Sequence, residues 1–310
     1  MTTLLDLQQQ LLDTDATLAQ LERAVAGDPN SPSLHAMAES LLNRRESLES
    51  AFLAEANSLG IDVCSYRLFG ERDRPTILGL AKVLGDFQTL VSVVYDAIKT
   101  HVPKERARFG LDVAAATSLE FGYSFAGSLG IVLTIPNERL LIGESVLDEA
   151  VQTIFGMAKA TQPGHILEHA RQLGPAPVRA LYRWAAGHAQ SGLGVDIEWR
   201  RERVIRSHLL AQRPELERLY LTIEATSEET VEEQELGCDL VGADVTRRSF
   251  HIRLEDGQDI RGSFKEAISA SHTVELPKRY RVKLRRTTRV KYSTEEEEVT
   301  FELLNLEPVA

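Results

Sequence analysis

The chain has 310 residues, of which 43% are hydrophobic and 26% are charged, a composition ordinary for a globular protein. This length favours two or three domains. The two cysteines, Cys64 and Cys238, lie far apart and neither belongs to a CxxC pair, which argues against a disulfide framework and a cysteine zinc site. We find no apolar run of bilayer-spanning length, and the N-terminus lacks the basic segment and apolar core of a signal peptide. We therefore expect a cytoplasmic protein that does not contact membranes.

The formal net charge of −11 is unevenly distributed along the chain. Residues 236–310 contain 13 Lys/Arg and 13 Asp/Glu, so the preceding part of the chain carries all of the net charge. A negative total charge argues against nonspecific coating of nucleic acid by the whole chain. The asymmetry suggests that the two parts have different roles.

The first 60 residues predict a helical hairpin arm. Over 3–26 the apolar seam has the heptad spacing of three and four, through Leu4, Leu7, Leu11, Thr14, Leu18, Leu21 and Val25. Gly27 suits the end of this helix, and Ser31–Pro32 suits the start of a second helix over about 34–59. The pattern favours an antiparallel hairpin that packs on itself, and the alternative is an oligomerisation arm. We therefore expect residues 1–60 to mediate self-association or to bind a protein partner.

Residues 61–202 predict an α+β domain with strands at 61–69 and 119–135 around an amphipathic helix over about 76–101. In the second of these stretches the apolar residues occupy every odd position, which predicts a β-hairpin with one face on the core: Leu119, Phe121, Tyr123, Phe125, Leu129, Ile131, Leu133 and Ile135. Its turn is expected at residues 126–128. The opposite face carries small residues from Gly122 to Gly130, so it either accepts a helix closely or forms a groove.

The rest of the chain predicts three helices, a returning strand and a β-rich end. Ser145 and Asp148 resemble a capping box that opens a helix, helices follow over 163–173 and 177–190, and a strand follows over 194–199. Residues 203–221 are expected to be helical, and 203–235 to form a helical and acidic connector. In 236–310, alternating short strands and the Asp256–Gly257 turn signal predict a small β-barrel or sandwich.

One short motif has the spacing of a metal site. His165, Glu168 and His169 form an HxxEH sequence, in which two histidines four residues apart share a helix face and hold zinc while the glutamate activates water. On a helical wheel, however, Ile166, Leu167, Ala170 and Leu173 define the buried face and turn Glu168 away from it. A solvated helix face is the alternative, and we assign no catalytic residue and no cofactor.

The strongest candidate for ligand contact is a basic run in the β-rich end. It places eight bases and two tyrosines within about fifteen residues: Lys278, Arg279, Tyr280, Arg281, Lys283, Arg285, Arg286, Arg289, Lys291 and Tyr292. On a strand, alternate bases share one exposed face, where they could contact phosphates while a tyrosine stacks on a base. The alternatives are cross-strand pairing with Glu295–Glu298 and Glu302, or an edge strand protected by its charges.

These features together predict a non-enzymatic, intracellular binding or scaffold protein. The C-terminal β domain would contact DNA, RNA or another polyanion through the basic run. Two alternatives stay open: a zinc-dependent hydrolase that uses the HxxEH motif, and a purely structural subunit of a larger assembly.

Overall fold

The computed structural model describes residues 3–70, 75–125, 129–138, 144–265, 276, 278–293 and 297–308. The chain divides into two compact units, Met1–Thr226 and Ser227–Ala310, which we describe one at a time. The predicted α+β class is confirmed. The first unit holds a helix pair and an antiparallel sheet with helices, and the second is a closed five-stranded barrel.

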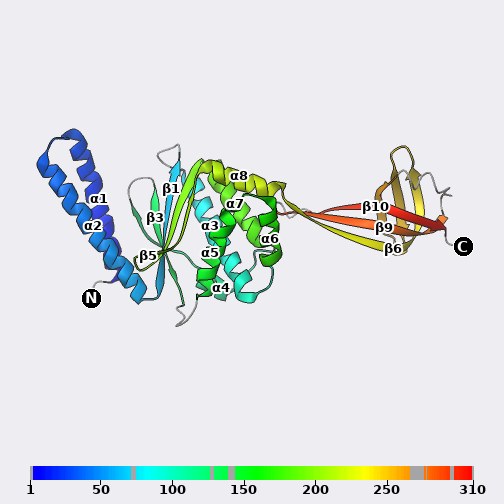
Figure 1. Cartoon of the computed structure of the whole chain (residues 1–310), viewed down its shortest axis with the longest axis horizontal. Coiled ribbons are helices and arrows are strands. Elements are labelled where there is room, and N and C mark those ends of the chain that lie inside the picture. The colour runs from blue at the N-terminus through cyan, green and yellow to red at the C-terminus, as the bar shows by residue number, and fades with distance from the viewer. Residues whose placement is uncertain are drawn as a thin grey trace. The chain divides into compact units, whose positions relative to one another are not determined.

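Helices α1 (Leu4–Gly27) and α2 (Pro32–Ser58) form the predicted hairpin (Figure 1). Thr3 and Asp6 close a capping box at the start of α1, and Pro32 occupies the first turn of α2. The seam of α1 is buried at Leu7, Leu11, Thr14, Leu18 and Leu21. The hairpin therefore packs on itself, and self-association through it stays a prediction.

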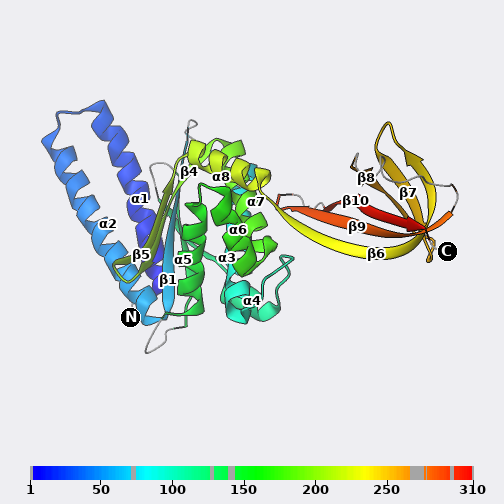
Figure 2. The same ribbon diagram turned by 45° about the vertical axis from the view of Figure 1, so that its right-hand side comes forward.

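The sheet of the first unit has five antiparallel strands in the order β2-β3-β1-β4-β5. Their bounds are β1 Ile61–Gly70, β2 Glu120–Phe125, β3 Gly130–Pro136, β4 Leu193–Arg201 and β5 Val204–Ala211. Six helices accompany them: α3 Ile77–Thr100, α4 Leu111–Ala116, α5 Val146–Ala158, α6 Pro163–Leu173, α7 Pro175–Ser191 and α8 Arg213–Ala225. Figure 2 shows the sheet between the α1–α2 hairpin and the layer that contains α3, α5 and α7. We call the two sides of the sheet the arm side and the core side.

A bulge in β2 changes the predicted face of the 119–135 hairpin. The register of β2 against β3 shifts between Phe121 and Tyr123, so that Tyr123 lies opposite Val132. Tyr123 and Val132 then join the arm-side cluster with Phe52 of α2, whereas Phe121 is 64% exposed. The expectation that all odd positions share one core face is therefore wrong, because the extra residue at Gly122 reverses the alternation. The expected turn at 126–128 lies outside the described residues.

Residues 203–225 also differ from the prediction of a single helix. Val204–Ala211 forms strand β5, which pairs with β4 and buries Leu209 and Ala211, and helix α8 begins only at Arg213. The acidic residues assigned to a connector lie in the first strand of the second unit, β6 (Ser227–Asp244). No such connector exists, because β-pairing with strand β9 (Lys278–Lys291) begins at Ser227.

Two buried polar networks fix the core side of the sheet. Asp62 is fully buried, and its carboxylate accepts hydrogen bonds from Arg201 (2.9 Å), Asn137 (2.7 Å) and Trp199 (3.1 Å). Arg201 also reaches Asp148 of α5 at 2.6 Å. This network joins β1, β4, the end of β3 and α5.

The second network joins β1 to α7. The indole N–H of Trp184 donates to the Tyr66 hydroxyl at 2.9 Å, and that hydroxyl lies 2.7 Å from Nε2 of His188. The tautomer of His188 decides which of these two atoms donates the shared proton. Burial lowers the pKa of His188 to about 3, so this histidine is neutral at physiological pH.

Helix α3 is long and apolar enough, by length and composition, to cross a bilayer, so the expectation that no segment has this character is wrong. In the structure its apolar side is buried at Val83, Phe87, Leu90 and Val94, and the helix packs against α5 and α7. Core helices of globular proteins have the same length and composition. The absence of membrane contact stays a prediction.

The second unit is a closed barrel with the strand order β10-β8-β7-β6-β9. Besides β6 and β9, its strands are β7 Ser249–Leu254, β8 Asp259–Phe264 and β10 Glu297–Pro308, with β8 and β10 parallel. Phe250, Ile252, Val282 and Leu284 are among the side chains that fill its core. The predicted barrel is confirmed, and Gly257 takes the positive φ of 84° in the β7–β8 turn.

Candidate functional site

The predicted basic run forms β9, which lies between β6 and β10 and is not an edge strand. Its apolar positions Val282 and Leu284 point into the barrel. The bases that alternate with them face outward, as predicted: Arg279, Arg281, Lys283 and Arg285. Tyr280 and Tyr292 are only 3% and 1% exposed, so the expectation that they stack on bases is wrong.

Acidic side chains of both neighbouring strands lie opposite these bases. The Arg285 guanidinium contacts Glu233 of β6 and Glu302 of β10, each at 3.0 Å. Lys283 Nζ lies 2.9 Å from the same Glu233 carboxylate. The hydrogen bonds from Lys283 and then Arg285 lower the pKa of Glu233, which in turn raises the pKa of Lys283. Arg285 is thus the centre of a three-strand row of acid, base and acid.

Three of the other bases of β9 also form ion pairs. Further ion pairs join Arg279 to Glu255, Arg286 to Glu232 and Arg289 to Glu229. Lys278 is exposed at the first position of the strand. Within the described part of the barrel, Arg281 and Lys291 have no ion-pair partner. We call this array of cross-strand pairs the charge ladder.

The charge asymmetry expected from the sequence disappears when the chain is divided at the boundary between the two units. The unit from Ser227 to Ala310 contains 13 Lys/Arg and 18 Asp/Glu, a formal charge of −5, because the acids of β6 belong to it. Ion pairs within the described residues engage five of the eight bases of β9. The main partners lie in β6, and of the predicted acids Glu302 is a partner, whereas Glu295 and Glu296 lie outside the described residues. Nucleic-acid contact through β9 stays a prediction.

The HxxEH motif lies on α6 as a largely solvated face. His165 and Glu168 are exposed, whereas Ile166 and Ala170 are buried against the unit. His169 is half-buried, and burial lowers the pKa of its imidazole. Over the described residues, no group of three or more His, Cys, Asp or Glu side chains is placed to hold a metal ion. The structure thus provides no further described ligand for this motif.

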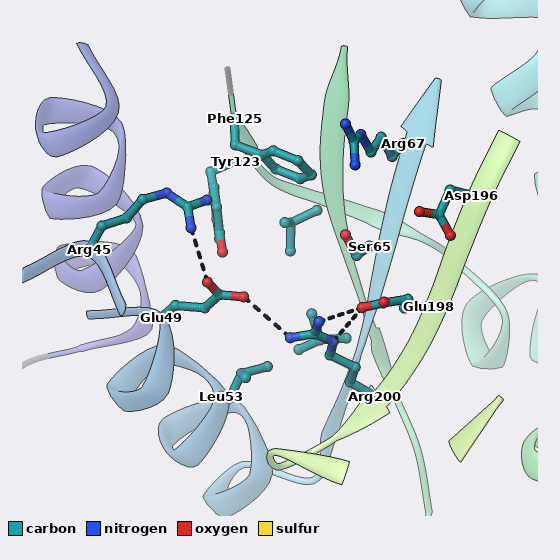
Figure 3. A pocket seen from close by; sticks show the side chains of 12 residues that line it. Arg45, Glu49, Leu53, Ser65, Arg67, Tyr123, Phe125, Asp196, Glu198 and Arg200 are labelled. Carbon is teal, nitrogen blue, oxygen red and sulfur yellow. Dashed lines mark hydrogen bonds and ion pairs between the residues drawn. The ribbon is translucent and has the colours of Figure 1, made fainter. Parts of the chain in front are cut away.

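A pocket that no sequence motif indicates lies between α2 and the arm side of the sheet (Figure 3). Its volume is about 230 Å³, below the range of about 300–1,000 Å³ typical of sites for drug-sized ligands. The floor is apolar and buried at Leu53, Val63 and Val132, with Tyr123 beside them. These residues come from α2, β1, β3 and β2, so the pocket exists only in the folded unit.

Charged side chains form one continuous chain along the pocket. Arg45 of α2 contacts Asp15 of α1 at 2.7 Å and Glu49 at 3.1 Å. Glu49 is 3.3 Å from Arg200 of β4, which also pairs with Glu198 (Figure 3). This chain links both arm helices to the sheet, so part of its role is to fix the arm in place.

The mouth of the pocket carries a further pair of opposite charges. Arg67 of β1 is exposed there, beside Asp196 of β4, whose carboxylate lies 2.7 Å from Nε2 of His208. The Arg45 guanidinium lies 5.8 Å from the centre of the Phe125 ring, within the range of a cation–π contact. Three guanidinium groups and three carboxylates therefore line the same small space.

The Tyr123 hydroxyl is the unusual polar group of this site. The side chain is only 2% exposed and its ring packs edge-on against Phe52 at 5.4 Å. Among the described residues the hydroxyl has no hydrogen-bond partner, although buried tyrosines usually find one. Figure 3 shows the hydroxyl directed into the pocket, towards Glu49. Burial raises its pKa, so it is a neutral donor and acceptor.

The sequence indicated one feature near this site: the small residues around Gly122 were expected either to accept a closely packed helix or to form a groove. The structure places α1 there, since a Cβ on Gly122 would lie 3.5 Å from the Gln8 side chain. The pocket itself lies on the same side of the sheet, next to the bulge that turns Tyr123 towards the arm. Its lining combines charged groups of both signs with an apolar floor. No protein-family model, no curated protein and no solved structure matches this chain.

Proposed function

We propose that this chain is an intracellular binding protein whose ligand site is the pocket between α2 and the sheet. The observation that carries the proposal is the Tyr123 hydroxyl, which lacks a partner among the described residues and points into a space lined by charges of both signs. Because this hydroxyl borders the pocket and is not itself fully buried, it is available to donate a hydrogen bond to a ligand that enters, or to accept one from it.

The lining favours a small zwitterion with an apolar side, such as a free α-amino acid. The guanidinium groups of the pocket attract a carboxylate, and its carboxylates attract an ammonium group. A ligand with a single charge would interact with only one of these two kinds of group. The apolar floor at Leu53, Val63 and Val132 suits a short aliphatic or aromatic side chain. The volume of about 230 Å³ limits the ligand to a small molecule.

Binding suits these residues better than acid–base chemistry. Glu49 and Glu198 already accept hydrogen bonds from guanidinium groups, and Asp196 is held by His208. Charges fixed in this way orient a ligand without an exchange of protons. The α1–α2 hairpin then forms one wall of the site.

Thermal unfolding of the full chain with the common free α-amino acids tests this proposal, followed by calorimetric titration of those that raise the melting temperature. We expect stabilisation by at least one free amino acid and none by its amide or its N-acetyl derivative, each of which lacks one charge. Tyr123→Phe is expected to weaken binding about tenfold or more, because it removes one hydrogen bond to the ligand. Tyr182→Phe is the matched control, since Tyr182 pairs with the Tyr220 ring outside the pocket. Equal binding by Tyr123→Phe and the wild type, or binding of none of the panel, would refute the proposal.

A further inference from the structure

A second and larger cavity lies in the first unit, between the end of β5, helix α8 and the segment that joins α5 to α6. Its volume is about 710 Å³, within the usual range for sites that bury a small-molecule ligand. The floor is formed by Ala160, Leu209, Ala211 and Leu219, none of which is more than 5% exposed. The cavity is thus distinct from the pocket beside α2, with which it shares no residue.

The lining of this cavity is mainly apolar. Besides the floor, Leu221 of α8 lines it and is 46% exposed, and Ala225 lies at the end of the same helix. Leu210 of β5 also lines it and is 54% exposed, so the space is open to solvent along one side and an alkyl chain laid in it would remove this apolar surface from water. The walls therefore select a hydrocarbon group rather than water.

The polar side chains at the cavity have an excess of positive charge. Lys159 and Arg218 line it, and neither forms an ion pair with a carboxylate in the part of the chain that the structure describes. Among the described residues, one N–H of Arg218 is engaged, by the Pro214 carbonyl at 3.3 Å. The acid nearby, Glu215, accepts the backbone N–H of Gln212 at 2.7 Å and closes the cap of α8. Two cations thus remain for a ligand.

We infer that this cavity binds an anionic amphiphile, a molecule with an alkyl chain and a carboxylate head. The alkyl chain lies over Ala160, Leu209 and Leu219, and the carboxylate accepts hydrogen bonds from Lys159 and Arg218. This assignment follows from the combination of apolar walls and unpaired cations, because a neutral or cationic amphiphile gains nothing from the cations. It does not depend on the proposed amino-acid site.

Displacement of the fluorescent probe dansyl-undecanoic acid from the full chain tests the inference. We expect the probe to bind, decanoic acid to displace it, decanol to be about tenfold weaker and decylamine to be weaker still. Failure of the probe to bind, or equal displacement by decanol and decanoic acid, would overturn the assignment.

Two variants locate the binding. Ala225→Trp fills the cavity from an exposed position and is expected to abolish probe binding. Lys159→Gln combined with Arg218→Gln is expected to remove the preference for decanoic acid over decanol but to keep binding of the alkyl chain, and Arg171→Gln on α6 is the control for loss of a surface charge. Retained probe binding by Ala225→Trp would refute the site. If sedimentation shows a wild-type dimer that Ala225→Trp dissociates, a second copy covers the cavity and the inference is wrong.

Discussion

Replacement of Arg201 by Met is the most direct test of the buried network on the core side of the sheet. Arg201 donates to both oxygens of Asp62, at 2.9 and 3.0 Å, and to Asp148 at 2.6 Å. The Asp62 side chain is completely buried and that of Asp148 is 5% exposed. Without Arg201, two carboxylates share a region of low dielectric constant, and Asn137 and Trp199 supply only neutral donors.

The expected loss in the free energy of unfolding is about 3 kcal/mol. Breaking a buried ion pair by removal of one partner costs about 3–5 kcal/mol, and the 22% exposure of the Arg201 side chain places this case at the lower end. Met keeps much of the aliphatic stem of Arg201, so packing contributes little to the difference. Both tryptophans, Trp184 and Trp199, lie in the first unit, so fluorescence during urea unfolding reports this unit alone.

Two further variants separate the charge effect from a general loss of stability. Arg203→Met removes an exposed arginine two residues away and is expected to change the free energy of unfolding by less than about 0.5 kcal/mol. Asp62→Asn combined with Arg201→Met removes the charge that Arg201 compensates, so it is expected to be more stable than Arg201→Met alone. A loss below about 1 kcal/mol in Arg201→Met, or no recovery in the double variant, contradicts this account of the network.

Three other perturbations follow from the structure. The pKa of His188 is about 3 in the folded chain and near 6.5 in the unfolded chain, so the free energy of unfolding should fall as the pH decreases from 6.5 to 3, by up to about 1.4 kcal/mol per pH unit. His188→Gln should flatten this slope, measured by urea titrations at each pH. Gly262→Ala should destabilise the barrel by about 1–3 kcal/mol, because the new Cβ would overlap a carbonyl oxygen of β10. A Cβ at Gly242 meets no such overlap, so Gly242→Ala is the control. The unfolding midpoints of the two variants, followed by circular dichroism, should differ clearly. Leu11 is fully buried between the arm and the sheet, so Leu11→Ala should lower the free energy of urea unfolding by about 2–5 kcal/mol. Leu5 is 75% exposed, so Leu5→Ala should change it negligibly. Similar values for both variants would show that the arm is not part of the folded core.

The parts of the fold that local patterns determine were predictable from the sequence. The heptad seam of α1, the amphipathic face of α3 and the capping box at Ser145 each concern neighbours within a few turns, so the hairpin arm and the helices appear where expected. The β-barrel was predictable for the same reason, since its inward residues alternate along each strand.

The errors arise where tertiary structure overrides or hides the local pattern. The bulge at Gly122 reverses the faces of β2, and alternation in one sequence gives no sign of it. Residues 227–235 lack apolar alternation, and the side chains of Glu229, Val231 and Glu233 are exposed, so a strand of the barrel was interpreted as an acidic connector. The pocket beside α2 brings together Arg45, Tyr123 and Arg200, which are separated by 78 and 77 positions, and no spacing rule connects them.

The two interpretations of strand β9 make opposite predictions for a reversal of charge. If the bases form a site for a polyanion, Arg285→Glu should weaken binding of single-stranded DNA, measured by fluorescence anisotropy at low salt, and a compensating Glu233→Arg on β6 should not restore the contact at β9. If they belong to the charge ladder, Arg285→Glu should lower the unfolding midpoint, because Glu233 and Glu302 then face a third acid, and the compensating change should recover part of the midpoint. We expect the second outcome, because the barrel unit carries more acids than bases and Arg285 already contacts two carboxylates. A steep salt-dependent loss of DNA affinity in Arg285→Glu with an unchanged midpoint would instead establish β9 as a binding surface.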